Sequence, residues 1–462
     1  MKNSQKLTGE QLKQAKDLVK QFKDIFTDLP GKTDIVEHTI KLTTNEPIRQ
    51  KPYPLPFAMR ETVKKEVQEM LDMGVIEQTN SPYSSPIVLV KKKDGSNRFC
   101  VDFRKINRVT AFDTEPMPTA EDIFAKLKDG CYFSKIDLAK GYWQIPVQKE
   151  DREKTAFVTP DGSYQFKRMP FGLVNSTATF NRMMRKAMDG IQNADTFVDD
   201  LLGHTETWED HLLTLRQILE RIEAAHLTVK PSKCCIGFRS LEFIGHQIGQ
   251  GTIRPSADKV DDIMQAEQPK TKKQVRAFLG LVGYYRQFIP NFASISVPLT
   301  DMTRKGQPNC VKWTENHETA FQTLKKCIAK EPVLKMPDFN QMFILQTDAS
   351  EDGLGATLTQ IFEGIKHPVM YASKKLLPRE KRYSTIELEC LALVWAIRKF
   401  LIYLYGREFM VETDHQPLTY INHAKYSNSR IMRWALFLQN FRFRIVAIKG
   451  CENVVADYLS RA

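Results

Sequence analysis

The sequence predicts a multidomain α+β protein, from its length and from two changes in its pattern. The chain has 462 residues, which at about 150 residues per domain corresponds to roughly three domains. Between residues 120 and 250, strand-like runs alternate with helix-like runs, and residues 256–330 are mainly helical in pattern. Near residue 332 a unit that begins with a strand follows. Helices and strands therefore mix within several domains.

Composition restricts the class of protein. Hydrophobic residues make up 42% of the chain and charged residues 26%, which is typical of folded material rather than of a disordered tail. No run approaches the roughly 18 uninterrupted apolar residues that a membrane span needs, so the sequence excludes an integral membrane protein. The polar start, MKNSQKLTGEQLKQ, has no apolar signal core, and we do not expect secretion.

Charge and cysteine content add two weaker indications. Lys and Arg outnumber Asp and Glu by 67 to 55, a formal net charge of +12, which favours polyanionic partners such as nucleic acid. A basic enzyme without such a partner fits the same balance equally well. The eight cysteines form no C-x-x-C pair, and no histidine cluster completes a zinc site. We therefore expect reduced thiols in an intracellular protein.

A first set of carboxylates lies in apolar surroundings. Asp137 stands inside the β-prone run FSKIDLAKGYWQI, where a carboxylate is costly to bury without compensation. Asp199 and Asp200 stand between apolar pairs in TFVDDLLGH, which indicates a tight hairpin with both acids at its tip. Taken singly, an edge-strand Asp and an Asp-rich turn remain alternatives. Together the three acids suit Mg²⁺, which prefers hard oxygen ligands and substrate phosphates.

A basic segment supplies the complementary charge. Residues 87–103 predict two strands around an Asp-Gly turn. Between residues 91 and 108 two acids face seven basic residues, namely Lys91, Lys92, Lys93, Arg98, Arg104, Lys105 and Arg108. A hairpin of this kind near the acids can hold a triphosphate by charge and by bidentate hydrogen bonds. An ordinary solvated charge run is the alternative.

A second set of acids occupies separate predicted elements of the C-terminal part. Asp348 follows one strand-like run, Asp414 ends another, and Asp457 lies in CENVVADYLSR. Glu387 and Glu389 stand in the first turns of a helix predicted over 385–403. Acids on separate elements can converge on one metal pair, as two-metal phosphodiester hydrolysis requires. Each acid taken singly also fits a surface position, and Glu387 fits a helix cap.

The motifs around these residues resemble the reverse transcriptases of gypsy-type long-terminal-repeat retrotransposons. The resemblance covers nearly the whole chain, and its blocks follow the family order: GVIEQTNSPYSSPIVLVKKKDGSNRFCVDFRKIN, FSKIDLAKGYWQI, RMPFGLVNSTATF, FVDD, LEFIGHQI and RAFLGLVGYYRQFIPNFASISVPL. It implies a right-hand polymerase of fingers, palm and thumb. In that fold Asp137, Asp199 and Asp200 correspond to the metal ligands of the palm.

The resemblance also implies substrate contacts. Lys92 and Arg98 correspond to fingers residues that contact the phosphates of the incoming nucleotide. Tyr142 corresponds to the aromatic residue that lies under the sugar and excludes a ribose 2′-hydroxyl, with a core aromatic as the alternative. The remaining matches are Phe171 and Gly172 beside the templating base, and Phe243, Gly245 and His246 at the primer end. For His246 a structural histidine is the alternative.

The C-terminal motifs TDAS, TDH and N-x-x-AD-x-LSR resemble the ribonuclease H domain of the same retrotransposons. Asp348, Glu389, Asp414 and Asp457 correspond to its catalytic acids. Glu389 is preferred to Glu387 as the catalytic acid because a Leu-Ala-type helical run follows Glu389. Retroviral relatives have a histidine in the C-terminal loop, and none occurs between residues 424 and 462. Proton transfer to the leaving group would then use another residue or water.

Two departures from the family pattern stand near the first acids. Phe197 replaces the usual Tyr at the start of the xxDD box, which removes a hydroxyl but no metal ligand. Asn175-Ser176-Thr177 replaces the common Asn-Ala-Pro. Because Ser and Thr are good N-caps, we expect this second change to alter the start of a helix.

We therefore expect an RNA-directed and DNA-directed DNA polymerase with a C-terminal ribonuclease H. Each active site would hold two Mg²⁺ ions, with Mn²⁺ as an alternative. The expected partners are an RNA template, a DNA primer, an RNA–DNA hybrid and dNTPs, in the cytoplasm or in a virus-like particle and with no membrane. The expected divisions are an N-terminal helix and extended arm (residues 1–55), fingers and palm (56–250), a mainly helical thumb or connection (251–335), and an RNase H-like domain (336–462).

Two other functions remain open. A degraded or domesticated product would bind nucleic acid without chemistry, although all seven acids are present. An enzyme with one live site is the second alternative. The sequence leaves undecided the oligomeric state, the primer, and whether the chain is a processed product, a truncated gene or a fragment.

Overall fold

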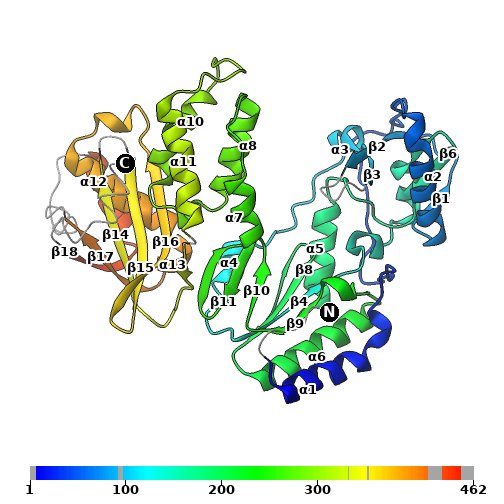
Figure 1. Ribbon diagram of the computed structural model, residues 1–462, viewed down its shortest axis with the longest axis horizontal. Coiled ribbons are helices and arrows are strands. Elements are labelled where there is room, and N and C mark those ends of the chain that lie inside the picture. Colours follow the sequence, from blue (N-terminus) through cyan, green and yellow to red (C-terminus); the bar gives the residue numbers. More distant parts are fainter. Residues whose placement is uncertain (1–6, 92–96, 331, 351–352, 415–428, 449–462) are drawn as a thin grey trace. The chain divides into compact units, whose positions relative to one another are not determined.

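The computed structural model describes residues 7–91, 97–330, 332–350, 353–414 and 429–448. It divides into two compact units, Met1–Ile244 and Gly245–Ala462, which Figure 1 shows as ribbons. The predicted Asp-Gly turn lies outside the described residues, as do Lys92 and Asp457. In the described part of the chain, no helix has both the length and the apolar character needed to cross a bilayer.

One part of the first unit is built on a five-stranded sheet with the strand order β1-β6-β5-β2-β3. Helix α2 (Phe57–Asp72) buries Val63, Val67 and Met70, which recur at helical spacing, in the core of this part. Strands β2 and β3 pair antiparallel, which confirms the predicted pair. The strand bounds are β1 (Ile76–Gln78), β2 (Ser85–Lys91), β3 (Asn97–Val101), β5 (Phe157–Thr159) and β6 (Gly162–Phe166). Two short helices, α3 (Arg104–Arg108) and α4 (Ala120–Phe124), follow β3 along the chain.

A four-stranded sheet with the order β7-β8-β4-β9 forms the other part of the first unit. Helix α6 packs on β8, and α1 packs in turn on α6 (Figure 1). The apolar faces of this sheet and of α1, α5 and α6 share one buried core, which gives the sheet a rigid support. The bounds are α1 (Gly9–Gln21), β4 (Tyr132–Asp137), α5 (Ser176–Ala187), β7 (Ala194–Phe197), β8 (Asp200–Thr205), α6 (Trp208–Ala224), β9 (Cys235–Phe238) and β10 (Ser240–Phe243).

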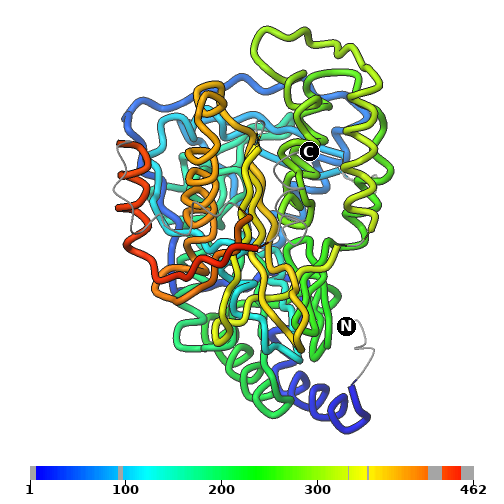
Figure 2. Tube along the Cα trace, turned by 90° about the vertical axis from the view of Figure 1, so that its left-hand side faces the viewer, coloured from blue at the N-terminus to red at the C-terminus, as the bar shows by residue number. Residues whose placement is uncertain are grey.

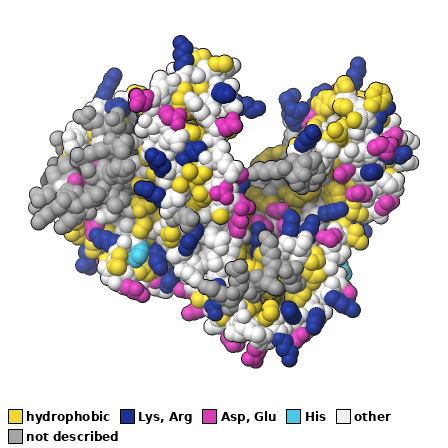
Figure 3. All heavy atoms as spheres, in the orientation of Figure 1, with side chains coloured by type: hydrophobic (Ala, Val, Ile, Leu, Met, Phe, Trp, Pro, Cys, Tyr) yellow, Lys and Arg dark blue, Asp and Glu magenta, His cyan; other side chains and the backbone are white. Residues whose placement is uncertain are grey.

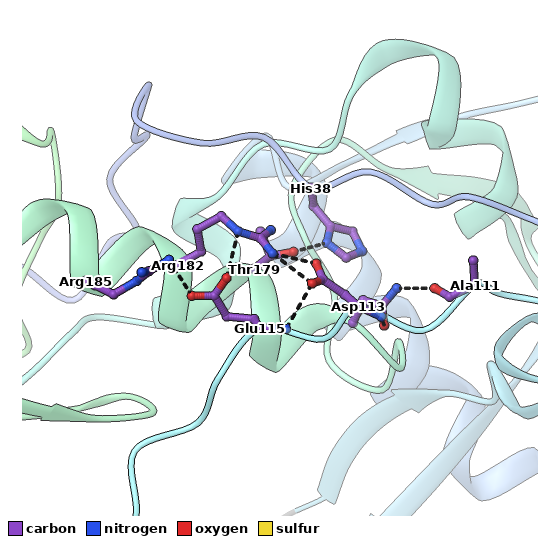
Figure 4. Close-up of polar contacts among 8 residues, drawn as sticks. His38, Ala111, Asp113, Glu115, Thr179, Arg182 and Arg185 are labelled. Atoms are coloured by element: carbon purple, nitrogen blue, oxygen red, sulfur yellow. Dashed lines mark hydrogen bonds and ion pairs between the residues drawn. The ribbon is translucent and has the colours of Figure 1, made fainter.

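An ionic network ties the connecting segment 109–119 to α5 (Figure 4). Arg182 donates from Nη2 to both carboxylate oxygens of Asp113 at 2.8 Å and from Nε to Glu115 at 3.0 Å. Arg185 pairs with the other oxygen of Glu115 at 2.8 Å. The guanidinium of Arg182 is thus held by two carboxylates at once, through charge-assisted hydrogen bonds. The segment that joins the two sheets of the first unit is therefore anchored on one helix.

His38 joins the N-terminal arm to the same helix. Its Nδ1 lies 2.9 Å from Oγ1 of Thr179, and the imidazole is buried. Burial lowers the pKa of His38 to about 4, and the negative charges of Asp151 and Asp113 oppose this shift only in part. The imidazole is therefore neutral in the folded protein at pH 7, and its protonation opposes folding.

The second unit begins with a small antiparallel sheet of β11, β12 and β13 and with five helices. The mainly helical pattern predicted for 256–330 is confirmed. A helix predicted over 273–289 ends earlier, at Gly283, and a 3₁₀ turn follows before Pro290, which cannot continue a helix. The bounds are β11 (His246–Gly249), β12 (Thr252–Pro255), α7 (Ala257–Met264), α8 (Lys272–Gly283), α9 (Phe292–Ile295), α10 (Val297–Met302), α11 (Glu315–Ala329) and β13 (Leu334–Lys335).

The rest of the second unit is a five-stranded sheet with the order β16-β15-β14-β17-β18. Strands β14, β15 and β16 are antiparallel, whereas β14, β17 and β18 are parallel. Figure 2 shows α12, in orange, running alongside the yellow strands, and α12 packs against β14. The bounds are β14 (Phe343–Ala349), β15 (Gly353–Phe362), β16 (Ile365–Lys375), α12 (Thr385–Lys399), α13 (Leu401–Leu404), β17 (Glu408–Thr413), α14 (Ser429–Leu438) and β18 (Arg442–Ala447).

Four of these five strands were predicted from the sequence, and β18 was not. The helix predicted over 385–403 is interrupted at Phe400, so that α12 and α13 are separate. The surface charges are mixed: on the face in Figure 3, Lys and Arg side chains are interspersed with Asp and Glu over the described atoms of both units. On this face, the net positive charge therefore does not gather into a single basic patch.

Replacing His38 by Asn tests the buried imidazole, because Asn can still reach Thr179 but does not titrate. The pKa of His38 falls from 6.5 to about 4 on folding, so its contribution to stability is complete above pH 6.5 and declines as the pH falls toward 4. Between pH 7 and pH 5 we expect the unmodified protein to lose about 2 kcal/mol more free energy of unfolding than His38→Asn. Urea unfolding at both pH values measures this difference, and equal losses would contradict the assignment.

Candidate active sites

The backbone brings the first three acids together at one end of the four-stranded sheet. Strands β4 and β8 are antiparallel, and their register pairs Asp137 with Asp200. Strands β7 and β8 form a hairpin in which Phe197 pairs with Asp200, so that Val198 and Asp199 are its two-residue tip. The predicted hairpin is confirmed, with one refinement: Asp199 is in the turn, and Asp200 is the first residue of β8.

The hairpin tip contains a strained residue. Val198 has a φ of 53°, a left-handed conformation that is unusual for a β-branched side chain. Strain of this kind costs on the order of 1–3 kcal/mol and persists only where surrounding structure imposes it. Here the short connection between two paired strands imposes it, and the result is that Asp199 is held beside Asp200 and opposite β4.

Two lysines neutralise the carboxylates of this cluster. Nζ of Lys233 lies 3.1 Å from Asp137, and Nζ of Lys135 lies 2.9 Å from Asp200. Among the described residues, no three His, Cys, Asp or Glu side chains converge closely enough to hold a metal ion. The backbone thus gathers the acids, while two of the three carboxylates are turned toward ammonium groups.

The cluster nevertheless has the charge of a cation site. Burial raises the pKa of Asp199, and the nearby carboxylates of Asp200 and Asp137 raise it further, while its own backbone N–H and Lys233 act in the opposite direction. A carboxylate that is disfavoured in its ionised form by like charges gains from an added cation. Carboxylate oxygens are hard donors of the kind that divalent ions take, but Asp137 and Asp200 are paired with lysines in this arrangement.

Tyr142 lies next to these acids, in a 3₁₀ turn over Gly141–Gln144. Its ring stacks on Phe180 with centroids 5.1 Å apart, and Phe171 lies 4.7 Å away on another side. Burial raises the pKa of Tyr142, the hydrogen bond to Thr177 lowers it, and the charge of Asp199 raises it. Tyr142 is half-buried, so it is not simply a core aromatic.

The other residues predicted to contact substrate occupy different surroundings. Phe171 is exposed, and Gly172 has a φ of 94°, in a loop held by Asn107, which donates to the Gly172 carbonyl at 2.8 Å. Arg98 is exposed on β3, opposite Val90. These three positions are open to a ligand. Lys92, which was predicted to act with Arg98, lies outside the described residues.

The residues predicted at the primer end are mostly internal. Phe243 is fully buried, with Nζ of Lys135 6.0 Å from its ring centroid. His246 is also buried, and its ring packs on Phe288 with centroids 5.6 Å apart. Gly245 has a φ of 68°, a conformation that favours glycine. The side chains of Phe243 and His246 therefore support the backbone of this segment and do not face solvent.

Three residues of the first cluster were not predicted from the sequence. Lys135 stands two positions before Asp137 on the same strand, and the two-residue period of a strand would have placed both on one face. Lys233 and Thr177 gave no such signal, because only folding brings them near. The Asn175-Ser176-Thr177 segment was expected to alter a helix start; α5 begins at Ser176 with Asn175 as N-cap and no side-chain cap bond, and the Thr177 hydroxyl lies 3.1 Å from that of Tyr142.

The second set of acids lies on neighbouring elements of the five-stranded sheet. In the parallel pair β14–β17, Gln346 stands beside Glu412 and donates to its carboxylate at 2.9 Å. Asp348 and Asp414 each follow two residues later, Asp348 within β14 and Asp414 directly after the end of β17. Asp348 is buried, at 3% exposure, which is costly for a carboxylate without a compensating charge.

Helix α12 contributes the third acid of this set. Glu389 is buried at 5% exposure on the helix that packs against β14. Glu387 has a structural role instead, because it accepts hydrogen bonds from the backbone N–H and hydroxyl of Ser384, which caps the helix, and pairs with Arg430 at 2.6 Å. The preference for Glu389 stays a prediction, and Asp457 lies outside the described residues.

Two family models match the chain. Residues 90–248 match "Reverse transcriptase (RNA-dependent DNA polymerase)", and residues 338–441 match "RNase H-like domain found in reverse transcriptase". The two matches contain the first and the second set of acids respectively, except for Asp457. Domains of these families use divalent metal ions.

Solved structures share the fold. A foamy viral protease-reverse transcriptase in complex with double-stranded DNA aligns with a TM-score of 0.86 at 24% identity, covering 97% of this chain and 95% of that one. The foamy viral enzyme in complex with RNA/DNA hybrid gives 0.82 at 23% identity, covering 97% and 61%. These likenesses confirm the predicted fold class, a right-hand polymerase followed by an RNase H-like domain.

Relatives by sequence are Pol polyproteins of transposons. The polyprotein from transposon 297 of Drosophila melanogaster is 40% identical over 93% of this chain and 41% of its own length. The polyprotein from transposon gypsy of the same organism is 36% identical over 97% and 45%, and the Tf2-3 polyprotein of Schizosaccharomyces pombe is 32% identical over 96% and 34%. The chain spans less than half the length of these curated relatives. The chain therefore carries a reverse transcriptase domain and an RNase H-like domain, and over nearly its whole length it is similar to the Pol polyproteins of gypsy-type and other long-terminal-repeat retrotransposons.

Proposed function

We propose that the chain is a bifunctional enzyme that copies retrotransposon RNA into DNA and degrades the RNA strand of the resulting hybrid. The observation that carries the proposal is the β4–β8 register, which sets Asp137 opposite Asp200 and next to Asp199. This arrangement lies within the segment that matches the reverse transcriptase family. In the polymerase reaction the primer 3′-hydroxyl attacks the α-phosphate of a dNTP, and pyrophosphate leaves.

We infer that Asp137, Asp199 and Asp200 hold two Mg²⁺ ions in the first site, with Mn²⁺ as the alternative. Asp348, Glu389, Asp414 and Asp457 would hold two more in the second. When bound, such ions lower the pKa of the attacking hydroxyl or water and neutralise charge on the leaving group. The chain itself supplies the carboxylates, at a position where their mutual repulsion favours a bound cation.

Other residues of the first unit would bind and orient the substrates. Lys92 and Arg98 are proposed to contact the nucleotide phosphates, Arg98 from an exposed position on β3. Tyr142 is proposed to lie under the sugar, since its ring is held beside Asp199. Phe171 and Gly172 are proposed to contact the templating base. For Phe243, Gly245 and His246 we propose a supporting role at the primer end, because the first and the last are buried.

The proposed partners are an RNA template, a DNA primer, their hybrid and dNTPs. Foamy viral enzymes of this fold have been solved in complex with RNA/DNA hybrid and with double-stranded DNA, which supports this choice. We also infer that the chain acts in the cytoplasm, as a product of a transposon. The proposed domains are the arm (residues 1–55), the fingers and palm (56–250), the thumb or connection (251–335), and the RNase H-like domain (336–462).

The substitution Asp199→Asn separates the catalytic role of the first cluster from its cost to stability. We expect extension of a DNA primer on a homopolymer RNA template to fall by about two to three orders of magnitude. In chelator at pH 7 we expect the thermal midpoint to rise, because folding raises the pKa of this carboxyl and its ionised form therefore opposes folding. The rise should shrink as the pH falls through the range in which the carboxyl is protonated.

The control for this experiment is Asp17→Asn, which removes an exposed carboxylate of α1 that is paired with Lys20. It should leave both extension and the thermal midpoint unchanged. Extension that survives Asp199→Asn would remove this residue from the mechanism. A midpoint that falls would show that Asp199 supports the fold rather than opposing it.

Two substitutions, one on α12 and one on β14, test the second site. Glu389→Gln and Asp348→Asn should each abolish cleavage of the RNA strand of a labelled RNA–DNA hybrid and leave primer extension. Glu387→Gln is the matched control: Gln can still accept the hydrogen bonds from Ser384, but it loses the charge that pairs with Arg430, so it should lower the thermal midpoint and retain cleavage. If Glu387→Gln abolishes cleavage and Glu389→Gln retains it, the assignment of the acids on α12 is wrong. If extension and cleavage fall together in Asp348→Asn, the proposal of two separate sites fails.

A further inference from the structure

We propose that Thr177 is a positioning residue for Tyr142, and that its hydroxyl fixes the tyrosine ring against which a nucleotide sugar is selected. The proposal deepens the polymerase function proposed above and rests on it. Thr177 does not itself touch the substrate in this account. Its effect passes through the ring of Tyr142 to the choice between deoxyribonucleotides and ribonucleotides.

A hydroxyl–hydroxyl contact links the two residues. Oη of Tyr142 lies 3.1 Å from Oγ1 of Thr177, a distance at which one hydroxyl donates to the other. Tyr142 belongs to the 3₁₀ turn over Gly141–Gln144, and Thr177 to the first turn of α5. The bond therefore joins two separate elements that are far apart in the sequence.

Packing holds the tyrosine ring only in part. On one side it stacks on Phe180 at an interplanar angle of 13°, and Phe180 is completely buried. The ring of Phe171, a residue that is 55% exposed and therefore less firmly held, has its centroid 4.7 Å from that of Tyr142. Packing alone fixes one face of the ring. The hydroxyl contact at the far end of the side chain limits the remaining tilt and swing.

Both ends of this bond are anchored. A Cβ added to Gly141 would come within 3.0 Å of Phe180, so the turn that carries Tyr142 lies directly on α5. Further along the same helix, Arg182 is bound to Asp113 and Glu115 (Figure 4). Since α5 cannot shift easily, Thr177 offers the tyrosine a fixed point of attachment.

The threonine at this position is a feature of this chain. The motif around Thr177 departs from the common Asn-Ala-Pro pattern, in which proline stands at this position. A proline side chain has no hydroxyl and cannot make the bond. Sugar selection in this chain should therefore depend on a hydroxyl that proline would not supply.

The test is single-nucleotide insertion with matched dNTP and rNTP on an RNA template. One neutral hydrogen bond contributes about 1 kcal/mol, so Thr177→Val should lower the ratio of kcat/KM for dNTP over rNTP by about fivefold. The change should appear mainly as a lower KM for rNTP. Thr177→Ser keeps a hydroxyl and should keep the discrimination of the unmodified enzyme.

A double-mutant cycle identifies the partner. Tyr142→Phe removes the other hydroxyl, so it should resemble Thr177→Val, and the double variant should be no worse than either single one. Thr179→Val is the matched control on α5, because it removes the hydroxyl that contacts His38. It should leave sugar discrimination unchanged, and thermal midpoints of all variants identify any loss of folding.

Three results would overturn the proposal. Equal loss of discrimination in Thr177→Val and Thr177→Ser would show that the hydroxyl is not responsible. Additive losses in the double variant would show that the two hydroxyls act independently. If Thr179→Val lowered discrimination as much as Thr177→Val, both substitutions would act only through the general stability of α5, and not through the bond to Tyr142. Two further results concern the proposed function on which this inference rests. If Tyr142→Ala extends primers with full discrimination, the proposed role of Tyr142 in sugar selection is wrong. If the unmodified chain extends no primer at all, the proposed polymerase function is wrong.

Discussion

The first candidate site depends on one feature, the antiparallel register of β4 and β8. That register pairs Asp137 with Asp200, and the short β7–β8 turn adds Asp199. Burial raises the pKa of Asp199, and repulsion by the other two carboxylates at this sheet end raises it further. The protein tolerates this charge, and a left-handed Val198, because the buried core beneath the sheet holds both strands in place. Lys135 and Lys233 balance the charge in part.

The second candidate site uses the same principle with different elements. Asp348 lies near the end of β14, Asp414 directly follows the parallel neighbouring strand β17, and α12 adds a buried Glu389. Glu387 lies close by on the same helix but is engaged with Ser384 and Arg430, which shows how an acid of this helix can be structural. In the first unit, burial and crowding disfavour the ionised form of Asp199. Charge of this kind is what a divalent cation offsets.

Helix α5 connects the first site to the rest of its unit. Its middle is bound through Arg182 to the segment 109–119, and through Thr179 to His38 of the N-terminal arm. Its first turn carries Thr177, which reaches the hydroxyl of Tyr142. The residues nearest the candidate nucleotide site are thus fixed by contacts that extend well away from it. A helix tied down at several points can hold an aromatic ring more precisely than a free loop can.

The sequence by itself determined most of the element types, though not β18, together with the two sets of acids and the resemblance to a family, because apolar periodicity and ordered motifs are local properties of the chain. It also indicated Glu389 over Glu387. Only the tertiary structure decided which side chains meet, such as Lys233 with Asp137 and Thr177 with Tyr142. It also decided that Phe243 and His246 are buried. These contacts join residues on separate elements, and neither spacing nor propensity encodes the packing that brings such elements together.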